Sequence, residues 1–271
     1  ACETDFAIIG YGKLGGIELG YTSDLDLVFV HKADPELATD GEKPIDNAVF
    51  YTRLGQRIVH ILNTQTPSGQ LYEVDMRLRP SGNSGLLVST LQAFEKYQRE
   101  DAWTWEHQAL ARARGVAGCD DTLKAFEDIR HQILGRQRDK ASLRQEVVDM
   151  REKMRSNLGT PAARQNDVFH IKHDNGGIVD VEFMVQFLML AWCPEHPELT
   201  QWSDNIRQLE ELGRAGVLPV DDTERLREVF ITLRSTIHRR ALQNLNSQVE
   251  GGAFTEERDY IQSMWKKVMV E

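Results

Sequence analysis

The connection between the first two apolar, strand-like runs of the chain is short and rich in glycine, and it limits the folds open to this sequence. Only 14 residues separate Ile9, which ends the first run, from Asp24, which precedes the second. They begin with a G-x-G-x-x-G motif at residues 10–15, the spacing of a dinucleotide-binding loop. A Rossmann unit, however, needs about 30 residues and a long crossover helix, and each glycine costs a helix interior about 1 kcal/mol relative to alanine. The sequence therefore argues against a dinucleotide-binding fold.

Two regions of different periodicity follow one another along the chain. Up to about residue 90 the pattern alternates, with strands expected at 6–9, 25–31, 71–79 and 86–90 and a helix at 45–62. Beyond that point it is helical, with breaks rich in Gly, Pro, Asn or Asp. Helices are expected at 90–100, 102–114, 121–134, 141–157, 178–192, 203–213, 221–243 and 254–269. We predict an α/β catalytic domain over residues 1–115 and an all-helical domain over residues 116–271.

Composition and charge disfavour several classes of protein. Hydrophobic residues make up 41% and charged residues 27% of the 271 residues, as in a globular protein, and no apolar run reaches the roughly 18 residues of a membrane span. The net charge of −10 disfavours a nucleic-acid binder. Cys2, Cys119 and Cys193 lack paired spacing, which favours a reducing cytoplasm over a disulfide framework or a structural zinc site. Because the chain enters a strand without a preceding methionine, we expect it to be part of a longer polypeptide.

Two aspartates at the start of the second strand give the strongest chemical signal. Asp24 and Asp26 are two residues apart, so both side chains face the same side of the strand. Like charges held about 5–7 Å apart beside an apolar run are costly without a cation, and hard oxygen ligands suit magnesium better than zinc. Asp75, on the polar face of a later predicted strand, is a candidate third carboxylate for a two-metal cluster. The alternative is that Asp24 is a solvated turn residue and that Asp75 pairs with Arg77 or Arg79.

Several motifs resemble a known enzyme family. The spacing from Gly12 through Ser23, Asp24 and Asp26 resembles the DNA polymerase beta-like nucleotidyltransferase superfamily. The segments GKLGGIELGYTSDLDLVF, VDMRLRPSG, WTWEHQALARAR and IKHDNGGIVDVEFMVQ cover most of the chain and resemble glutamine-synthetase adenylyltransferase. In that family one of two homologous halves attaches AMP to a tyrosine of glutamine synthetase, and the other removes it by phosphorolysis. The forms YGKLGG, WTWEHQAL and WKKVMVE resemble the C-terminal, adenylylating half.

The resemblance implies a fold, a reaction and a set of partners. The expected fold is α+β: a nucleotidyltransferase-fold mixed sheet with helices, followed by an all-helical bundle domain. The expected reaction uses magnesium and the substrate ATP, and Asp24, Asp26 and Asp75 would be both the catalytic residues and the metal ligands. Glutamine synthetase and the PII signalling protein are the expected partners, without nucleic acid or membrane, in the cytoplasm.

The nucleotide-binding residues follow from the same resemblance. Gly12 and Ser23 would hold the triphosphate. Lys13 stands where the superfamily commonly has serine and would serve a phosphate as a point charge. Arg77 and Arg79, on the polar face of their predicted strand, would stabilise developing charge; a plain ion pair with Glu73 or Asp75 is the alternative.

Two further groups of residues have open roles. Trp105, Gln108 and Arg112 lie at spacings of three and four and so share a helical face. They either border the nucleotide pocket or pack inside the domain. Asp180 and Gln186 lie within an apolar helix, where a carboxylate needs partners. These partners are expected either within the bundle or at the active site.

Three functions are compatible with the sequence. The first is adenylylation of glutamine synthetase, the second is phosphorolytic removal of AMP from it, and the third is a regulatory binding module with a vestigial metal site. The complete set of carboxylates disfavours the third.

Overall fold

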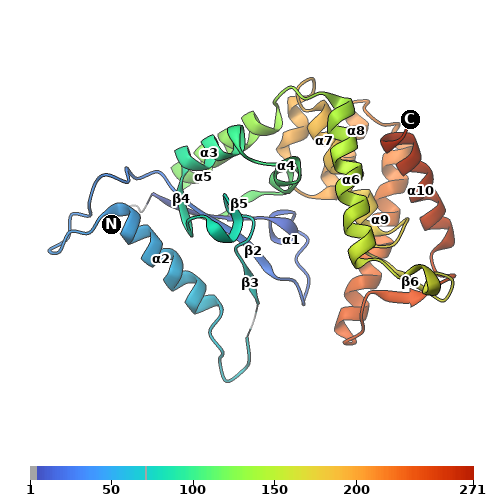
Figure 1. Ribbon diagram of the computed structural model, residues 1–271, viewed down its shortest axis with the longest axis horizontal. Coiled ribbons are helices and arrows are strands. Elements are labelled where there is room, and N and C mark those ends of the chain that lie inside the picture. Colours follow the sequence, from blue (N-terminus) through green and yellow to red (C-terminus); the bar gives the residue numbers. More distant parts are fainter. Residues whose placement is uncertain (1–4, 71) are drawn as a thin grey trace. The chain divides into compact units, whose positions relative to one another are not determined.

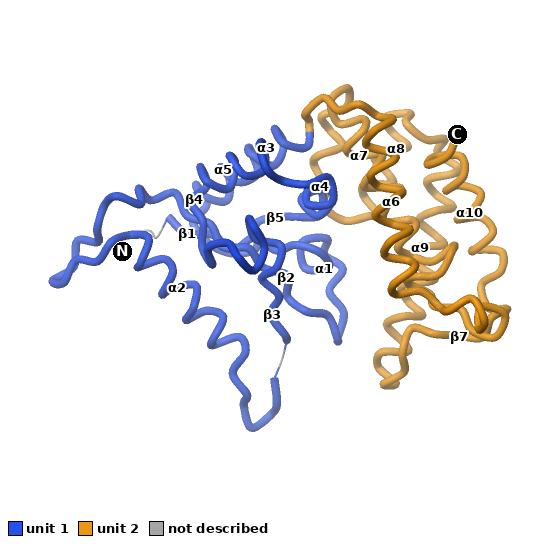
Figure 2. The backbone as a smooth tube through the Cα atoms, in the orientation of Figure 1, with its two compact units in different colours: residues 1–134 blue, residues 135–271 orange. Residues whose placement is uncertain are grey.

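The computed structural model describes residues 5–70 and 72–271, and the chain divides into two compact units. Unit 1 comprises residues 1–134 and unit 2 residues 135–271 (Figure 2). The predicted division after residue 115 falls inside a strand of unit 1, β5 (Arg114–Gly118). The next helix, α5 (Asp120–Leu134), packs against the sheet of unit 1 and extends that unit to residue 134.

A five-stranded mixed sheet forms the centre of unit 1. Four strands follow the order β3-β2-β1-β5, and β4 pairs with a later part of β2. The strands besides β5 are β1 (Phe6–Gly10), β2 (Leu25–His31), β3 (Val74–Asp75) and β4 (Val88–Thr90). The helices besides α5 are α1 (Gly12–Gly15), α2 (Asn47–Leu62), the 3-10 turn η1 (Gly82–Ser84), α3 (Leu91–Glu100) and α4 (Thr104–Ala111) (Figure 1). The fold class is α+β, as predicted.

The pairing of β1 with β2 decides between the two interpretations of the glycine-rich connection. The two strands are antiparallel, with Phe6 opposite His31 and Gly10 opposite Leu27. A dinucleotide-binding unit requires its first two strands to be parallel and joined by a crossover helix. Here α1 is four residues long. The prediction against a Rossmann unit is therefore confirmed.

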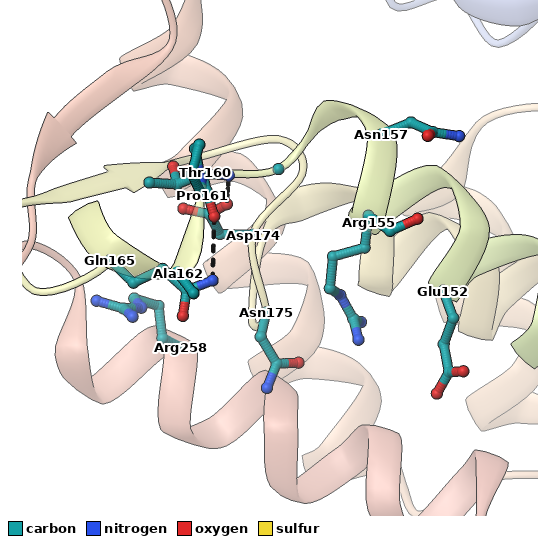
Figure 3. A pocket seen from close by; sticks show the side chains of 12 residues that line it. Glu152, Arg155, Asn157, Thr160, Pro161, Ala162, Gln165, Asp174, Asn175 and Arg258 are labelled. Carbon is teal, nitrogen blue, oxygen red and sulfur yellow. Dashed lines mark hydrogen bonds between the residues drawn. The ribbon is translucent and has the colours of Figure 1, made fainter.

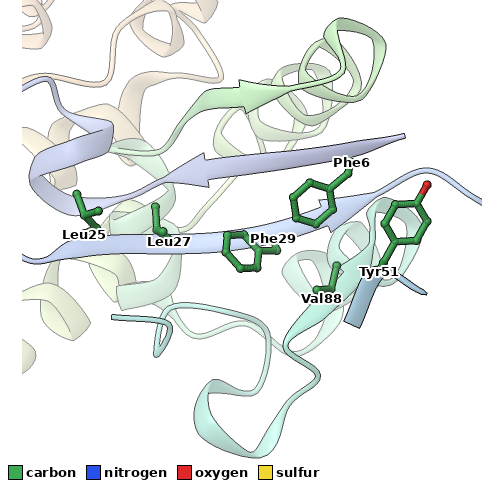
Figure 4. Close-up of a cluster of buried hydrophobic side chains, with 6 residues drawn as sticks. All are labelled: Phe6, Leu25, Leu27, Phe29, Tyr51 and Val88. Carbon is green, nitrogen blue, oxygen red and sulfur yellow. The ribbon is translucent and has the colours of Figure 1, made fainter. Parts of the chain in front are cut away.

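The face of β2 turned towards α2 holds a hydrophobic core. Alternate residues of β2 contribute to it, and partly buried side chains of α2 pack against it. The six buried members of the cluster are Phe6, Leu25, Leu27, Phe29, Tyr51 and Val88 (Figure 4). Because successive side chains of a strand alternate between its faces, Asp26 lies on the face opposite this core.

Only two residues of the strand predicted at 71–79 form one. The chain turns directly after β3 because the Asp75 carboxylate accepts a hydrogen bond from the Arg77 backbone N at 2.8 Å. Such a local bond replaces the ladder bond that a longer strand would make. The expected alternation of Arg77 and Arg79 along one strand face is therefore wrong. Leu71 lies outside the described residues.

Unit 2 is mainly helical, and its helices lie within two residues of the predicted ranges. They are α6 (Lys140–Leu158), α7 (Ile178–Trp192), α8 (Asn205–Arg214), α9 (Val220–Leu242) and α10 (Thr255–Met269), with the 3-10 turns η2 (Ala162–Arg164) and η3 (Pro197–Gln201). An antiparallel pair of three-residue strands, β6 (Val168–His170) and β7 (Gln248–Glu250), adds to the predicted bundle. Strands this short show no usable alternation in the sequence.

Asp180 has its partners inside unit 2. Its carboxylate is fully buried, and Oδ1 accepts hydrogen bonds from Arg151 Nε at 2.7 Å and Arg155 Nη2 at 3.1 Å. Oδ2 accepts a third from the Gly176 backbone N at 2.8 Å. Gln186, on the same helix, is also buried. These bonds join α6, which carries both arginines, to the start of α7. They also supply the partners without which a buried carboxylate is not tolerated.

The helices and the cysteines of the described residues bear on two further predictions. Among residues 5–70 and 72–271, no helix is long and apolar enough to cross a membrane. Among the described residues, Cys119 and Cys193 take part in no disulfide, and Cys2 lies outside these residues.

Candidate active site

Asp26 and Asp75 are direct neighbours on two parallel strands. Their Cα atoms are register partners in the β2–β3 pair, and neighbouring strands lie about 4.8 Å apart. Asp24 precedes β2 by one residue and has the same parity as Asp26. The negative charges of Asp75 and Asp24 both act on Asp26. The structure thus places the three predicted carboxylates together at the start of β2.

The pKa of Asp26 is raised from its ordinary 3.8 to about 6. Burial is the main cause, and the charges of Asp75 and Asp24 add to it, while Lys13 and Arg77 oppose it. The positive charge around Asp26 is therefore too small to compensate its own and its neighbours' charges. A carboxylate in this state fits a divalent cation as a further partner.

Asp75 already has a positive partner. Arg77 Nε lies 3.0 Å and 2.8 Å from the two carboxylate oxygens, and Arg77 Nη2 adds an ion pair. These contacts from Arg77 hold the pKa of Asp75 below its ordinary value. The ion pair considered as an alternative in the sequence is therefore present. Because the Arg77 side chain is 72% exposed, the pair contributes little to stability and is easily exchanged.

The three carboxylates do not form a complete metal cluster as they stand. Across the described ranges, no three His, Cys, Asp or Glu side chains are grouped so that they could hold a metal ion. The metal-ligand role of Asp24, Asp26 and Asp75 therefore stays a prediction, which the charge state of Asp26 supports.

The backbone at Gly12 lies directly against the Asp26 side chain. Its φ of 53° lies in the left-handed region that favours glycine, and a Cβ at this position would lie 2.3 Å from Asp26 Oδ2. The neighbouring Tyr11 backbone N donates to the Asp26 carbonyl oxygen at 2.9 Å. The loop is thus folded directly against the aspartate, and a side chain at residue 12 would displace one of them.

Lys13 and Ser23 both lie between Gly12 and Asp26 in the sequence. The buried Ser23 hydroxyl accepts a hydrogen bond from the Gly20 backbone N at 3.0 Å, which closes the turn before β2. Lys13 is exposed on α1, and its charge acts on Asp26. Ser23 therefore shapes the loop, whereas the Lys13 ammonium is available to a phosphate group.

Arg79 holds a turn. Its guanidinium donates to the carbonyl oxygens of Met76 at 2.8 Å and Asn83 at 3.2 Å. These bonds tie together the segment between β3 and β4. Its position supports a structural role, with its charge acting on Asp75 from a distance.

Arg112 forms a buried ion pair that the sequence pattern did not reveal. Its Nη2 lies 2.7 Å from Glu18 Oε2, and both side chains are 5% exposed. The glycines after Gly12 make room for it: a Cβ at Gly15 would lie 2.0 Å from the Arg112 carbonyl oxygen, and one at Gly16 2.6 Å from its Nη2. Arg112 is therefore a packed residue behind the glycine loop.

The other two members of the same predicted face have different surroundings. Gln108 is buried, whereas the Trp105 side chain is 38% exposed.

A further arginine, Arg114 on β5, donates to the Gly15 carbonyl oxygen at 3.0 Å and to that of Leu14 at 3.3 Å. The end of α1 is thus held by a strand about 100 residues later in the chain. No local pattern in the sequence could reveal this contact.

These features define a class of protein. A mixed sheet places clustered aspartates at the start of β2, and a glycine loop between β1 and β2 folds against them. This is an α+β domain of the nucleotidyltransferase type, followed by a helical unit.

Comparisons with known proteins then show the family. A family model described as glutamate-ammonia ligase adenylyltransferase matches residues 1–129, and one described as GlnD PII-uridylyltransferase matches residues 148–251. The chain is similar to proteins named bifunctional glutamine synthetase adenylyltransferase/adenylyl-removing enzyme. It is 56% identical to that of Pseudomonas putida over 97% of the chain, and 56% identical to that of Hahella chejuensis over 98%. It spans 28% of the length of each relative. The chain therefore belongs to this family of adenylyltransferases and corresponds to one part of the longer enzymes.

Proposed function

We propose that this chain transfers AMP from ATP to a tyrosine of glutamine synthetase and releases pyrophosphate. The observation that carries the proposal is the pairing of Asp26 with Asp75 on adjacent strands, with Gly12 folded against the first of them. The names of the relatives indicate the reaction, and the residues of this chain supply a site of the matching chemistry. Transfer of this kind lowers glutamine synthetase activity as the level of modification rises.

Magnesium is the cofactor that the carboxylates fit. Asp24 and Asp26 would hold it, and Asp75 would join them by exchanging Arg77 for the ion. The raised pKa of Asp26 supports this assignment: it results first from burial and then from the charges of Asp75 and Asp24, and a bound cation would offset both effects. When bound, magnesium would polarise the phosphate oxygens of ATP and neutralise part of their charge.

The remaining residues of the site would bind and orient ATP. The backbone amides around Gly12 approach a phosphate closely because no Cβ intervenes. Lys13 would supply a positive charge to the same group, and Ser23 would keep the loop closed through Gly20. Arg77, once released from Asp75, would be free to meet the negative charge that develops on the leaving pyrophosphate.

The acceptor tyrosine needs help to lose its proton. An unassisted phenol has a pKa near 10, so at neutral pH a neighbouring base must take the proton as the new bond forms. Asp75 would take this proton: the contacts from Arg77 hold its pKa below the ordinary value, so its carboxylate is ionised at neutral pH. The phenolic oxygen would then bond to the α-phosphorus of ATP, and the bond to pyrophosphate would break.

Unit 2 is proposed to serve regulation. Residues 148–251 match the model named for the PII-uridylyltransferase, which supports docking of the PII signalling protein on this unit. We place the chain in the cytoplasm, where ATP and glutamine synthetase are both present.

Incubation with ATP labelled at the α-phosphate, magnesium and glutamine synthetase tests the proposal. Label that appears on a synthetase tyrosine supports it. The printed names of the relatives also include adenylyl removal, so the reverse assay uses adenylylated synthetase with and without phosphate. Loss of AMP only with phosphate would assign this chain to removal. No turnover in either direction, together with tight binding to the synthetase, would assign it a regulatory role and overturn the proposal.

A further inference from the structure

Ile17, in the connection between β1 and β2, has a backbone conformation that is unusual for its residue type. Its φ of 54° lies in the left-handed region, which costs any L-residue free energy and which β-branched residues almost never adopt. The residue is also 57% exposed, so less than half of it is buried. The backbone is therefore strained, and burial of the side chain does little to offset that strain.

The residues on both sides of Ile17 are fixed and impose this conformation. Gly16 lies so close to Arg112 that a Cβ there would be 2.6 Å from Arg112 Nη2. Glu18 forms the buried ion pair with Arg112, and its backbone N donates to the Lys13 carbonyl oxygen at 2.7 Å. A glycine or asparagine at position 17 would adopt the same backbone with less strain. Strain that is retained in this way is typical of segments that contact a ligand.

Tyr21 is a second exposed side chain of the same connection. It occupies a corner of the turn over residues 20–23, in which the Ser23 backbone N donates to the Gly20 carbonyl oxygen at 3.2 Å. The Ser23 hydroxyl accepts from the Gly20 backbone N in the same turn. Tyr21 is 74% exposed on this fixed turn, and Asp24 follows the turn directly.

The connection presents an apolar surface without net charge. Between Leu14 and Ser23 the one charged residue is Glu18, whose carboxylate is buried in its ion pair. The whole chain carries a net charge of −10, so a neutral segment next to the aspartates is a local exception. Tyrosine is among the residues that contribute most to protein–protein binding, and an aliphatic neighbour such as Ile17 adds apolar area.

The exposure of the two side chains favours a macromolecular partner over a small molecule. Small-molecule sites are concave and enclose most of their ligand. Unit 2 has such a hollow, of about 560 Å³, and the hydrogen bond from the Thr160 backbone N to Asp174 Oδ1 fixes part of its wall (Figure 3). Ile17 and Tyr21 are instead open to solvent over more than half of their surface. Only a partner with an extended surface of its own would cover them.

We propose that Ile17 and Tyr21 contact the acceptor protein of the proposed reaction and bind an uncharged, apolar stretch beside the tyrosine that receives AMP. The inference rests on the proposed function, because the aspartates fix where that tyrosine must lie. The connection begins at the glycine loop and ends at Asp24, so an acceptor segment that reaches the aspartates would pass beside it. The fixed backbone holds both side chains ready for the partner, which lowers the cost of ordering them on binding.

Ile17→Asn separates this role from a purely structural one. Asparagine tolerates the left-handed region, so the variant should unfold at the same urea concentration as the unaltered chain or at a higher one. In AMP transfer we expect its KM for glutamine synthetase to rise about tenfold, with the KM for ATP unchanged. A lower unfolding midpoint would show that Ile17 supports the fold and would count against the proposal.

Tyr21→Ala is the second variant, and its position on an exposed turn makes loss of the fold unlikely to obscure the result. We expect a rise of about tenfold in the KM for glutamine synthetase here too. Leu37→Ala is the matched control, because Leu37 is 60% exposed and lies beyond the opposite end of β2 from Asp24. This control should leave the KM values for both substrates unchanged.

The possible results distinguish this inference from the proposed function. If the unaltered chain transfers AMP and both variants keep its KM for glutamine synthetase, the inference alone is overturned. A rise in the KM for ATP instead would assign Ile17 and Tyr21 to nucleotide binding and would also overturn it. No transfer to glutamine synthetase by the unaltered chain would overturn the proposed function, and the inference with it.

Discussion

Gly12 and Asp26 are packed so closely that a Cβ at position 12 would lie 2.3 Å from the Asp26 carboxylate oxygen and would displace one of the two residues. The backbone of the glycine loop and the aspartate are therefore a single unit of structure. The same closeness would let backbone amides and a carboxylate act on neighbouring atoms of one substrate. Changes at residue 12 should affect stability and substrate binding together.

Gly12→Ala should destabilise unit 1 both through its positive φ and through the collision with Asp26. Gly216→Ala is the matched control, because Gly216 also has a positive φ, 72°, but nothing lies within 4 Å of its Cβ position. We expect Gly216→Ala to cost about 1 kcal/mol and Gly12→Ala at least about 2 kcal/mol more. Urea unfolding of both variants measures the difference, and equal costs would show that the loop has room to move away from Asp26.

Asp26→Asn should stabilise the metal-free chain at pH 7 while it abolishes transfer of AMP. The pKa of Asp26 in the folded state, about 6, exceeds its ordinary 3.8. Between these two pH values the folded state binds more protons than the unfolded state, so the free energy of unfolding falls as pH rises through this window. Because solvent screens part of this effect, Asp26→Asn should raise the free energy of unfolding at pH 7 by about 1 kcal/mol.

The pH dependence gives the check on that prediction. Thermal unfolding with a chelator present, between pH 4 and pH 7, should show a smaller gain from Asp26→Asn as the pH falls below about 6. Asp40→Asn, at an exposed position of the same unit, is the control and should leave the unfolding temperature unchanged. A destabilised Asp26→Asn variant at neutral pH would contradict the raised pKa.

Arg112→Met should be more harmful than the double variant Arg112→Met with Glu18→Gln. The two side chains form a buried ion pair, and removal of one partner leaves an uncompensated buried charge that costs about 3–5 kcal/mol. Neutralising Glu18 as well should restore a large part of that loss. Urea unfolding of the single and double variants measures the coupling, and strictly additive effects would show that the pair is not energetically linked.

Asp180→Asn should destabilise unit 2 by about 3–5 kcal/mol, because Arg151 would lose its counter-ion in a fully buried position. The exposed Asp259→Asn on α10 is the control, with an expected change within about 0.5 kcal/mol. Hydrogen exchange separates the units: faster exchange should appear in α6 and α7 and leave β1 and β2 unaffected. Equal loss of protection in both units would contradict a role confined to unit 2.

The sequence predicted the elements with strong periodicity and missed those fixed by distant partners. The helix at Ile178–Trp192 matches its prediction to the residue, because a long apolar pattern with Gly177 before it leaves little choice of bounds. The residues of β5 that follow Arg114 were predicted to lie in the break between two helices, because glycine is a poor strand former. Pairing with β1 makes this segment a strand. Similarly, the alternation over residues 71–79 predicted a long strand, but the hydrogen bond from the Arg77 backbone N to the Asp75 carboxylate turns the chain after Asp75.

In the candidate site too, the residues marked by a local pattern were predicted, and those held by distant partners were missed. Asp24 and Asp26 were predicted from their spacing and Asp75 from the polar face of its predicted strand, and the parallel register of β2 and β3 brings Asp26 and Asp75 side by side. Their metal-binding role stays a prediction. The ion pair of Arg112 with Glu18 joins residues 94 positions apart. Neither residue lies in a local pattern that could have indicated the other.

The position of β1 between β2 and β5 has a consequence for the order of folding. β1 meets β2 across a connection of 14 residues, but it meets β5 only after more than 100 residues have been made. Closing the longer loop costs about 2 kcal/mol more by chain entropy. As the chain is synthesised, one side of β1 therefore stays unpaired until β5 emerges, and Arg114 can hold the end of α1 only from then on. The glycine loop is therefore made well before β5, yet it reaches its final form only once β5 has paired with β1.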